Sequence, residues 1–585
     1  MKLILSQYLR SLKERAEFDR LLPDLLFAMN YVPISRPQVG VRQYGVDLAT
    51  VGTNEDGVDE LLLVVIKRGD ITRSNWDSGP QAVRPSLNEV FDVYLTTHVD
   101  PAHKSRQKRI VVATTGDLKQ DVEINWNGYV KEHANLAIIN FWGVDRIASF
   151  IERYLLNENI FVSEDRMLLR KSLALSGEID YDRKDLYKLI SRQLGLGRVG
   201  QLDRKQNARE LQKALRTVNL STRIFSQWSE DEGNLKHALI ASERAMLWTW
   251  HRINLESPTD ATLYKEFRPL LESHQEVGKR YFEKLENHLT IKDGLAGYSN
   301  DDAPFSVMVF EQIGLLATIG LAQAIYYEGE DNLALNFIYA DRVAKGLASL
   351  LKNNPVSGSP RFDHNMIDIV LGLLLLKSAH LDSVADEWLT ELVIRADYTF
   401  ISERKFPISS DSFEDLADVM FSDDEDLRNS LKKTSWILPT LATWSVILNQ
   451  NDLYEKLAKS SKNAYPEVCL QLWHPNKDCV KYMYFAAACD QCGEVEAPIN
   501  LPSTLAEFRE MMKAILTTSR FDISKFSLAC VAGMDALDLI AARHFRTPIA
   551  PSFWYSLLDT CEPPKRYQYT ADTESDSSAV PFGTF

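Results

Sequence analysis

Asp47 and Lys67 are the two residues whose types and spacing point most directly to chemistry. Asp47 lies at the start of a short predicted strand over residues 46–52, and Lys67 ends an apolar predicted strand over residues 60–67. The turn signal Asn-Glu-Asp-Gly at 54–57 separates the two strands. Antiparallel pairing through this turn brings the start of one strand to the end of the other. A carboxylate and an ammonium group held together in this way suit metal-assisted hydrolysis of a phosphodiester.

Such a reaction needs more than one oxygen ligand for the cation. Asp19, on a predicted helix before the hairpin, is the candidate second carboxylate. The backbone carbonyl of Ile66 is a further oxygen suited to Mg²⁺ or Mn²⁺. We therefore predict a metal site formed by Asp47, Asp19 and the Ile66 carbonyl, with Lys67 as the cationic catalytic group.

The elements around these residues alternate in the manner of an α/β domain. Apolar residues recur at helical spacing over residues 5–30, and apolar strand patterns return at 108–116 and 136–142. The segment between those two strands and the segment 145–157 both have helical patterns. These patterns predict a central mixed sheet flanked by helices within residues 1–165.

This stretch resembles the PD-(D/E)XK nuclease superfamily, in its Mrr-like restriction-endonuclease branch. The resemblance rests on Phe18–Asp19 on the helix, Gly45–Asp47 at the first strand and Val65–Lys67 at the end of the second. It covers residues 11–157 and depends on the order and spacing of its short motifs. It implies a restriction-endonuclease-like fold, a bound Mg²⁺ or Mn²⁺ ion and DNA as the substrate.

The sequence departs from that family at Val65, where the family has Glu or Gln. Val65 cannot bind a metal, so three readings stay open. The site works with Asp19, Asp47 and a backbone carbonyl, or another acid replaces the missing one, or the domain is a decayed relative. Glu60 is a poor replacement because a regular strand turns it to the opposite face from Lys67, whereas Asp70 is better placed.

Basic residues near the hairpin are candidates for contacts with nucleic acid. The net charge of −15 argues against a uniformly basic cradle, so any DNA contact must come from a local patch. A mixture of basic and aromatic residues suits phosphate and base contacts. The candidates are Arg68, Arg73, Trp76 and Arg84, with a second cluster at Lys104 and Arg106 that taken alone is more typical of a solvated loop.

The rest of the chain has a different organisation. Residues 166–561 are predicted to form an all-α, irregular helical array without a fixed repeat, and the acidic segment near 405–430 is a candidate break between two subdomains. The apolar stretch 307–327 contains Glu311 and has no basic flank, which favours a buried helix over a membrane span. Residues 562–585 have the composition of a disordered tail.

The six cysteines all lie in the last quarter of the chain and do not resemble a disulfide framework. We therefore expect a cytoplasmic protein with no membrane partner. Cys489 and Cys492 have zinc-ligand spacing, with Cys469, His474 and Cys479 upstream. The upstream residues lack a second short knuckle, so we favour buried free cysteines over a structural zinc.

We expect a metal-dependent endonuclease that cleaves DNA, regulated by its helical region and, by family analogy, acting in bacterial defence against phage. Cutting of both strands favours a homo-oligomer, a dimer or larger. The chain has no phosphate-binding loop, so any ATPase or sensing activity would come from a partner protein. The alternative is a catalytically decayed nuclease fold that serves as a DNA- or protein-binding scaffold in a defence complex. Least favoured is a purely structural helical adaptor with an unrelated α/β cap.

Overall fold

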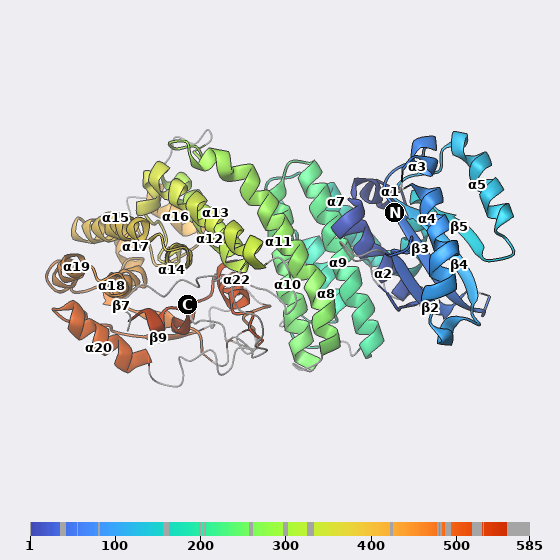
Figure 1. Cartoon of the computed structure of the whole chain (residues 1–585). Coiled ribbons are helices and arrows are strands. Elements are labelled where there is room, and N and C mark those ends of the chain that lie inside the picture. Colours follow the sequence, from blue (N-terminus) through green and yellow to red (C-terminus); the bar gives the residue numbers. More distant parts are fainter. Residues whose placement is uncertain are drawn as a thin grey trace, which may run out of the picture. The chain divides into compact units, whose positions relative to one another are not determined.

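The computed structural model divides into two compact units. Unit 1 comprises Met1–Gly195 and Arg204–Asn234, and unit 2 comprises Leu196–Asp203 and Leu235–Phe585 (Figure 1). The structure describes residues 2–558 apart from 36–42, 55, 80–81, 156–162, 198–199, 204–205, 257–260, 297–301, 324–332, 422–424, 477–478, 480–481, 486–492, 517–528 and 530–531. The predicted disordered tail at 562–585 lies outside the described residues.

Unit 1 is built on a five-stranded mixed sheet, as the sequence patterns predict. The strands lie in the order β1-β2-β3-β4-β5. Strands β1, β2 and β3 pair antiparallel, whereas β3, β4 and β5 are parallel to one another. Their bounds are β1 Val32–Pro33, β2 Leu48–Thr53, β3 Asp59–Lys67, β4 Gln107–Thr114 and β5 Ile138–Trp142.

Strand β3 is the centre of the sheet and is buried on both faces. Its side chains at 61, 63 and 65 belong to an apolar cluster with Val83, Leu87 and Val90. The alternate side chains at 62, 64 and 66 are at most 3% exposed and point to the other face. An apolar run without alternation is typical of such a strand, because helices cover both of its faces.

Helical segments surround this sheet (Figure 1). The predicted helix over 5–30 is three segments rather than one, because residues 12 and 13 interrupt it. Helical segments at 73–77 and 83–98, which the sequence patterns did not predict, lie between β3 and β4 in the chain. The segments are α1 Lys2–Ser11, η1 Glu14–Phe18, α2 Asp19–Ala28, α3 Arg73–Asp77, α4 Val83–Glu89, η2 Val90–His98, η3 Pro101–His103, α5 Gln120–Glu132, α6 Val144–Phe150 and η4 Ile151–Leu155.

Unit 1 continues beyond residue 165, because three further helices pack with the sheet layer. They are α7 Ser163–Ala174, α8 Lys184–Leu194 and α9 Ala208–Asp231, the last starting with a capping box formed by Asn207 and Glu210. The guanidinium of Arg216 in α9 lies 3.9 Å from the ring centroid of Phe27 in α2. The same helix bonds to η4 through the hydroxyl of Thr217, which donates to the Leu155 carbonyl at 3.3 Å.

Unit 2 is mainly helical, as predicted. Its described residues also include four strands of two or three residues, too short for a period-two pattern to reveal. Its elements are α10 Leu235–Glu256, α11 Ala261–Leu289, α12 Asp302–Ala322, α13 Leu333–Asn353, α14 Asn365–Ser378, α15 Asp382–Ile401, α16 Phe413–Phe421, α17 Glu425–Ser430, β6 Thr434–Ser435, α18 Ile437–Ile447, α19 Asn451–Asn463, β7 Cys469–Leu470, β8 Leu472–His474, β9 Glu494–Glu496, α20 Leu505–Leu516 and α22 Ala536–Phe545.

The acidic segment near 405–430 is part of unit 2. Leu416 and Val419 of α16 form a buried apolar cluster with Phe362 and Ile408. One apolar face of this otherwise acidic helix thus attaches the segment to its surroundings, and a break between two subdomains near 405–430 stays a prediction. The apolar stretch predicted as a buried helix is α12: its window Ala303–Ala322 is long and apolar enough to cross a membrane, but 83% of it is buried inside the protein.

Candidate active site at the ends of strands β2 and β3

The hairpin predicted from the sequence brings Asp47 to the end of β3. In this hairpin Leu48 pairs with Val64, and Asp47 directly precedes Leu48. The Asp47 amide donates to the Val64 carbonyl at 2.9 Å, and its Oδ2 accepts from the Ile66 amide at 2.7 Å. One carboxylate oxygen of Asp47 is thus fixed by the backbone beside Lys67. The fixed oxygen orients the second one.

Glycine is required where the chain enters this position. Gly45 has a φ of +79°, which L side chains rarely adopt. A Cβ atom on Gly45 would also lie 2.1 Å from the carbonyl oxygen of Ser86 in α4. The Gly-Val-Asp motif therefore has a physical cause: only glycine allows the loop to pass α4 and deliver Asp47 to the sheet.

Lys67 is half-buried at the end of β3. Its Nζ donates to the Ser86 hydroxyl at 3.2 Å, so the side chain extends toward α4. Ser86 is 8% exposed. Helix α4 was not predicted from the sequence, and neither was this partner of the lysine.

The carboxylate of Asp47 is only partly compensated. Burial raises the pKa of Asp47 above its ordinary value, and the Ile66 amide and the Lys67 ammonium lower it by less. Glu14 and Asp19 raise this pKa further, which means that both carboxylates lie close enough to repel that of Asp47. Three acids and one lysine therefore gather at this end of the sheet.

A π-type turn explains why Glu14 joins Asp19. The Asp19 amide donates to the Glu14 carbonyl, five residues earlier, where η1 gives way to α2. This i to i−5 bond places Glu14 one turn before Asp19. Sequence reasoning identified Asp19 but not Glu14, because the spacing rules for an α-helix do not place residues five apart on one face.

Val65 and the two acids considered as its replacement have clear positions. Val65 is fully buried in the apolar cluster, on the same face of β3 as Lys67. Glu60 is also fully buried at the opposite end of β3, where both of its oxygens accept from Arg109 Nε at 2.9 Å. Neither residue adds a carboxylate beside Asp47.

Asp70 has partners of its own. Its carboxylate lies 2.7 Å from Lys119 Nζ and accepts from the Asp117 amide at 2.9 Å. These two bonds lower the pKa of Asp70, with a smaller contribution from Arg10. Asp70 is thus held by other cations, which removes the reason for expecting it to replace the missing acid beside Lys67.

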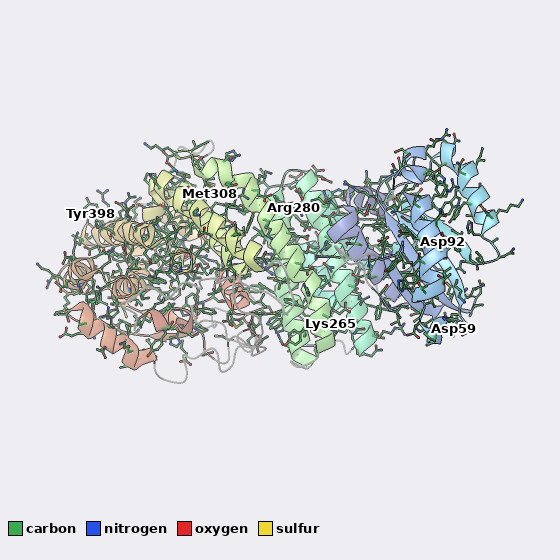
Figure 2. All side chains as sticks on the ribbon, in the orientation of Figure 1. Asp59, Asp92, Lys265, Arg280, Met308 and Tyr398 are labelled. Atoms are coloured by element: carbon green, nitrogen blue, oxygen red, sulfur yellow. The ribbon has the colours of Figure 1, made fainter. Side chains whose placement is uncertain are left out.

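The basic residues predicted to contact nucleic acid fall into two groups. Arg68, Arg73 and Arg84 are exposed, and they lie in the chain from the end of β3 to α4. Arg84 pairs with Asp77 at 3.2 Å. Lys104 and Arg106 precede β4, whose first residue pairs with Glu60, so they lie at the other end of the sheet from Lys67. There Arg106 is 3.6 Å from Asp59, which is labelled in Figure 2.

Trp76 does not belong with these contacts. It is 2% exposed, and its ring packs edge-on against Trp126 and Tyr129. The prediction that Trp76 stacks on a base is wrong, because the indole is part of the apolar core of unit 1.

The donor set suits a hard cation. Carboxylate oxygens are the ligands that Mg²⁺ prefers, and this ion is usually held by one or two carboxylates together with substrate phosphates. Asp47 and Asp19 are two carboxylates of this kind, and Glu14 lies close enough to raise the pKa of Asp47. Within the described ranges, no group of three or more His, Cys, Asp or Glu residues is arranged to hold a metal ion by itself. Cys489 and Cys492 lie outside those ranges, whereas Cys469 and Cys479 are free thiols.

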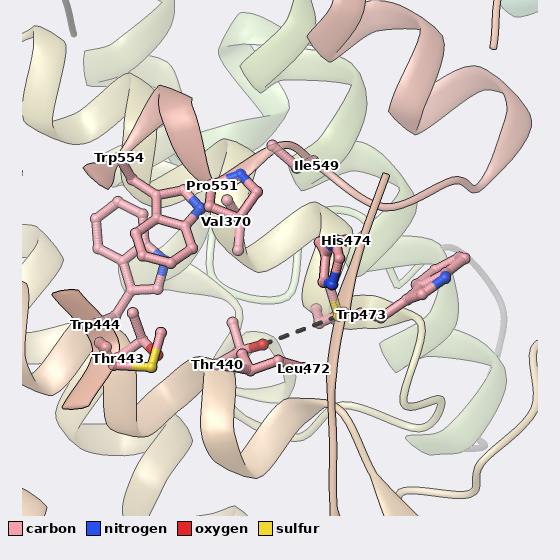
Figure 3. Close-up of a pocket in the computed structure, with 12 residues that line it drawn as sticks. Val370, Thr440, Thr443, Trp444, Leu472, Trp473, His474, Ile549, Pro551 and Trp554 are labelled. Atoms are coloured by element: carbon pink, nitrogen blue, oxygen red, sulfur yellow. Dashed lines mark hydrogen bonds between the residues drawn. The ribbon is translucent and has the colours of Figure 1, made fainter. Parts of the chain in front are cut away.

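Unit 2 contains a cavity that could be considered as a binding site. It is lined mainly by apolar side chains, with Trp444, Trp554 and Pro551 on one side and Trp473 and His474 on the other (Figure 3). Its volume is about 30 Å³. That is room for about two water molecules, so it is too small for a substrate.

Comparisons of the chain with protein-family models, with curated proteins and with solved structures return no match. Function has therefore to be inferred from the geometry of the residues themselves.

Proposed function

We propose that unit 1 contains a metal-dependent endonuclease domain of the PD-(D/E)XK type that cleaves DNA phosphodiesters. The observation that carries this proposal is Asp47, a half-buried carboxylate with a raised pKa beside Lys67 at the end of an antiparallel hairpin. A carboxylate whose charge is poorly compensated gains most from a bound cation. The mixed sheet and the order of its elements support the same proposal.

Each residue has a distinct role in this proposal. Asp47 and Asp19 hold Mg²⁺ or Mn²⁺, with the Ile66 carbonyl as a further ligand. When bound, such an ion activates water and polarises the phosphate. The Lys67 ammonium stabilises the charge that develops on the phosphoryl oxygens. The Ile66 amide orients Asp47, and Arg68, Arg73 and Arg84 contact the DNA backbone.

The helical remainder has a regulatory role in this proposal. It holds a homo-oligomer together, responds to a trigger or restrains the nuclease. By analogy with restriction enzymes alone, the protein is a cytoplasmic effector of defence against phage, with a partner protein supplying ATPase or sensing activity.

One observation favours a second candidate function. Val65 occupies the position of a family acid and is fully buried among apolar side chains. In this alternative the catalytic site has decayed, and the domain binds DNA or protein as a scaffold.

Cleavage assays on supercoiled and linear DNA with Mg²⁺ or Mn²⁺ test the proposal. Asp47→Asn and Lys67→Ala should each lower metal-dependent cleavage at least about a hundredfold, the scale of losing one electrostatic catalytic group. Asp92→Asn and Lys131→Ala, exposed on η2 and α5, are matched controls that should cut like the wild type (Asp92 is labelled in Figure 2). Cleavage that persists in both site variants contradicts the proposal. Salt-dependent DNA binding without any cleavage by the wild type supports the scaffold instead.

A further inference from the structure

Helix α4 connects the two halves of the candidate site through one residue, Ser86. The Ser86 hydroxyl donates to the Ala82 carbonyl at 2.9 Å, so its hydrogen is directed back along the helix. The hydroxyl oxygen is then left with lone pairs to accept from Lys67 Nζ at 3.2 Å. Because the hydroxyl is buried and its own hydrogen is engaged, it has a single orientation toward the lysine.

The backbone of the same residue contacts the loop that delivers Asp47. The Ser86 carbonyl oxygen lies 2.1 Å from where a Cβ of Gly45 would be, and Val90 Cγ2 lies 3.1 Å from that point. Asp47 follows two residues later. One turn of α4 therefore sets both the position of the loop before Asp47 and the direction of the Lys67 side chain.

Ser86 also differs in charge from the group that Val65 replaces. A carboxylate at position 65 would add a negative charge on that face of β3, whereas the Ser86 hydroxyl accepts a hydrogen bond and carries no charge. Val65 itself lies in the apolar cluster and supplies no carboxylate to Lys67. A neutral acceptor fits a site in which the lysine must meet a phosphoryl group.

We infer that Ser86 is a positioning residue that holds the Lys67 ammonium toward the scissile phosphate. This inference rests on the proposed function for its catalytic meaning, but the contact between Ser86 and Lys67 can be tested without any cleavage. Ser86→Ala removes the acceptor and keeps a good helix former in α4. Ser86→Thr keeps a hydroxyl. Ser176→Ala is the matched control, since Ser176 is also buried in unit 1 and its hydroxyl bonds to a backbone carbonyl, that of Leu173, at 2.8 Å.

The first measurement is the rate at which an acylating reagent modifies Lys67 in the full chain, followed by peptide mass spectrometry. The bond to Ser86 holds the Lys67 amine against α4, and a side chain released from this bond is more open to the reagent. Ser86→Ala should therefore raise the modification rate about three- to tenfold, as expected for the loss of one hydrogen bond. Ser86→Thr and Ser176→Ala should react like the wild type. An unchanged rate in Ser86→Ala overturns the inference.

The second measurement separates positioning from binding. Ser86→Ala should lower kcat for DNA cleavage about tenfold with little change in KM, and Ser86→Thr should restore it. A loss that Ser86→Thr does not restore, or one that Ser176→Ala reproduces, indicates a merely structural role and contradicts the inference. If the wild type cleaves no DNA, the proposed function fails, while the modification rates still decide whether Ser86 holds Lys67.

Discussion

Two places in the molecule set a carboxylate beside cations, and they do so in opposite ways. In unit 1 burial raises the pKa of the half-buried Asp47, and repulsion by Glu14 and Asp19 adds to the effect, while a lysine opposes it. In unit 2 the Glu243 side chain is 1% exposed, between Arg543 and His544. Burial raises the pKa of Glu243, but these two neighbours outweigh it and hold the pKa at about 2.

The charge of Glu243 in unit 2 is compensated by its neighbours. Glu243 accepts from Arg543 and from His544 Nδ1, the latter at 2.7 Å. Arg244 Nε donates to the other ring nitrogen of His544 at 2.5 Å, so the imidazole is neutral. Burial lowers the pKa of His544 to about 3, in agreement with that assignment.

The difference indicates what each cluster does. A buried carboxylate that is compensated by a buried arginine joins helices α10 and α22, and it gains little from a further cation. A half-buried carboxylate with too few cations gains from a metal ion. Compensation of charge, more than the kinds of residue present, distinguishes the structural cluster from the candidate active site.

The largest effect should come from removing the charge of the buried Glu243. Glu243→Gln leaves the buried Arg543 without its anion and should destabilise unit 2 by about 3–5 kcal/mol. Urea denaturation combined with hydrogen exchange measures the loss and assigns it to unit 2. The control is Glu311→Gln, because Glu311 pairs with Lys236 at a more exposed position and should contribute less than about 1 kcal/mol. Equal losses of stability in the two variants would contradict the distinction between the buried ion pair and the exposed one.

A second buried acid in unit 2 should give stability a pH dependence. Burial raises the pKa of Asp363 from its ordinary value of 3.8 to about 6, although the Ile437 and Trp436 amides and the Ser435 hydroxyl oppose it. Between these values the unfolded chain has lost a proton that the folded chain keeps. The free energy of unfolding should therefore fall as pH rises from 4 to 6, by about 3 kcal/mol in all. The denaturation midpoint should depend less on pH across this range in Asp363→Asn than in the wild type. Identical pH curves for the two proteins would contradict the raised pKa of Asp363.

Removing the charge of Asp47 should affect stability in the opposite way to removing the charge of Glu243. Asp47→Asn keeps an acceptor for the Ile66 amide and relieves a disfavoured charge, so unit 1 should be unchanged or up to about 1 kcal/mol more stable at pH 7. Because the folded pKa is raised, this gain should disappear as pH falls toward 4. Thermal denaturation at the two pH values checks this, with Asp92→Asn as control. A clear loss of stability would mean that Asp47 is structural.

The smallest effect compares the two ends of the sheet. Arg68 follows Lys67 directly, whereas Lys104 precedes β4, at the other end of the sheet. Arg68→Ala should weaken DNA binding about threefold and reduce its salt dependence, and Lys104→Ala should change neither. Titrations at several salt concentrations decide this. A stronger effect of Lys104→Ala would place the DNA at the other end of the sheet.

The parts of the site that could be predicted from sequence are those with a regular period. The hairpin, its turn and the buried strand β3 follow from alternation and turn chemistry, and with them the meeting of Asp47 and Lys67. Glu14 was missed because a π-type turn, not an α-helical one, brings it to Asp19. Ser86 was missed because α4 is only one part of a short, irregular helical stretch.

Two further differences have a tertiary cause. Trp76 stands among basic and polar residues in the sequence, but Trp126 and Tyr129, some 50 residues away, bury it. The boundary at 165 reflects the end of the strand pattern, whereas α7–α9 pack with the sheet unit through contacts that no local period reveals.

Metal-directed cleavage of the protein backbone tests most directly whether the poorly compensated carboxylate binds a cation. Fe²⁺ replaces Mg²⁺ at oxygen-rich sites and, with peroxide, cuts the chain around the ion. We predict cuts near residues 45–48 and 65–68 in the wild type, loss of these cuts in Asp47→Asn, and none near Glu243. Cuts at residues 45–48 that persist in Asp47→Asn, or a wild type that is cut only elsewhere, would contradict the assignment of Asp47 as a metal ligand.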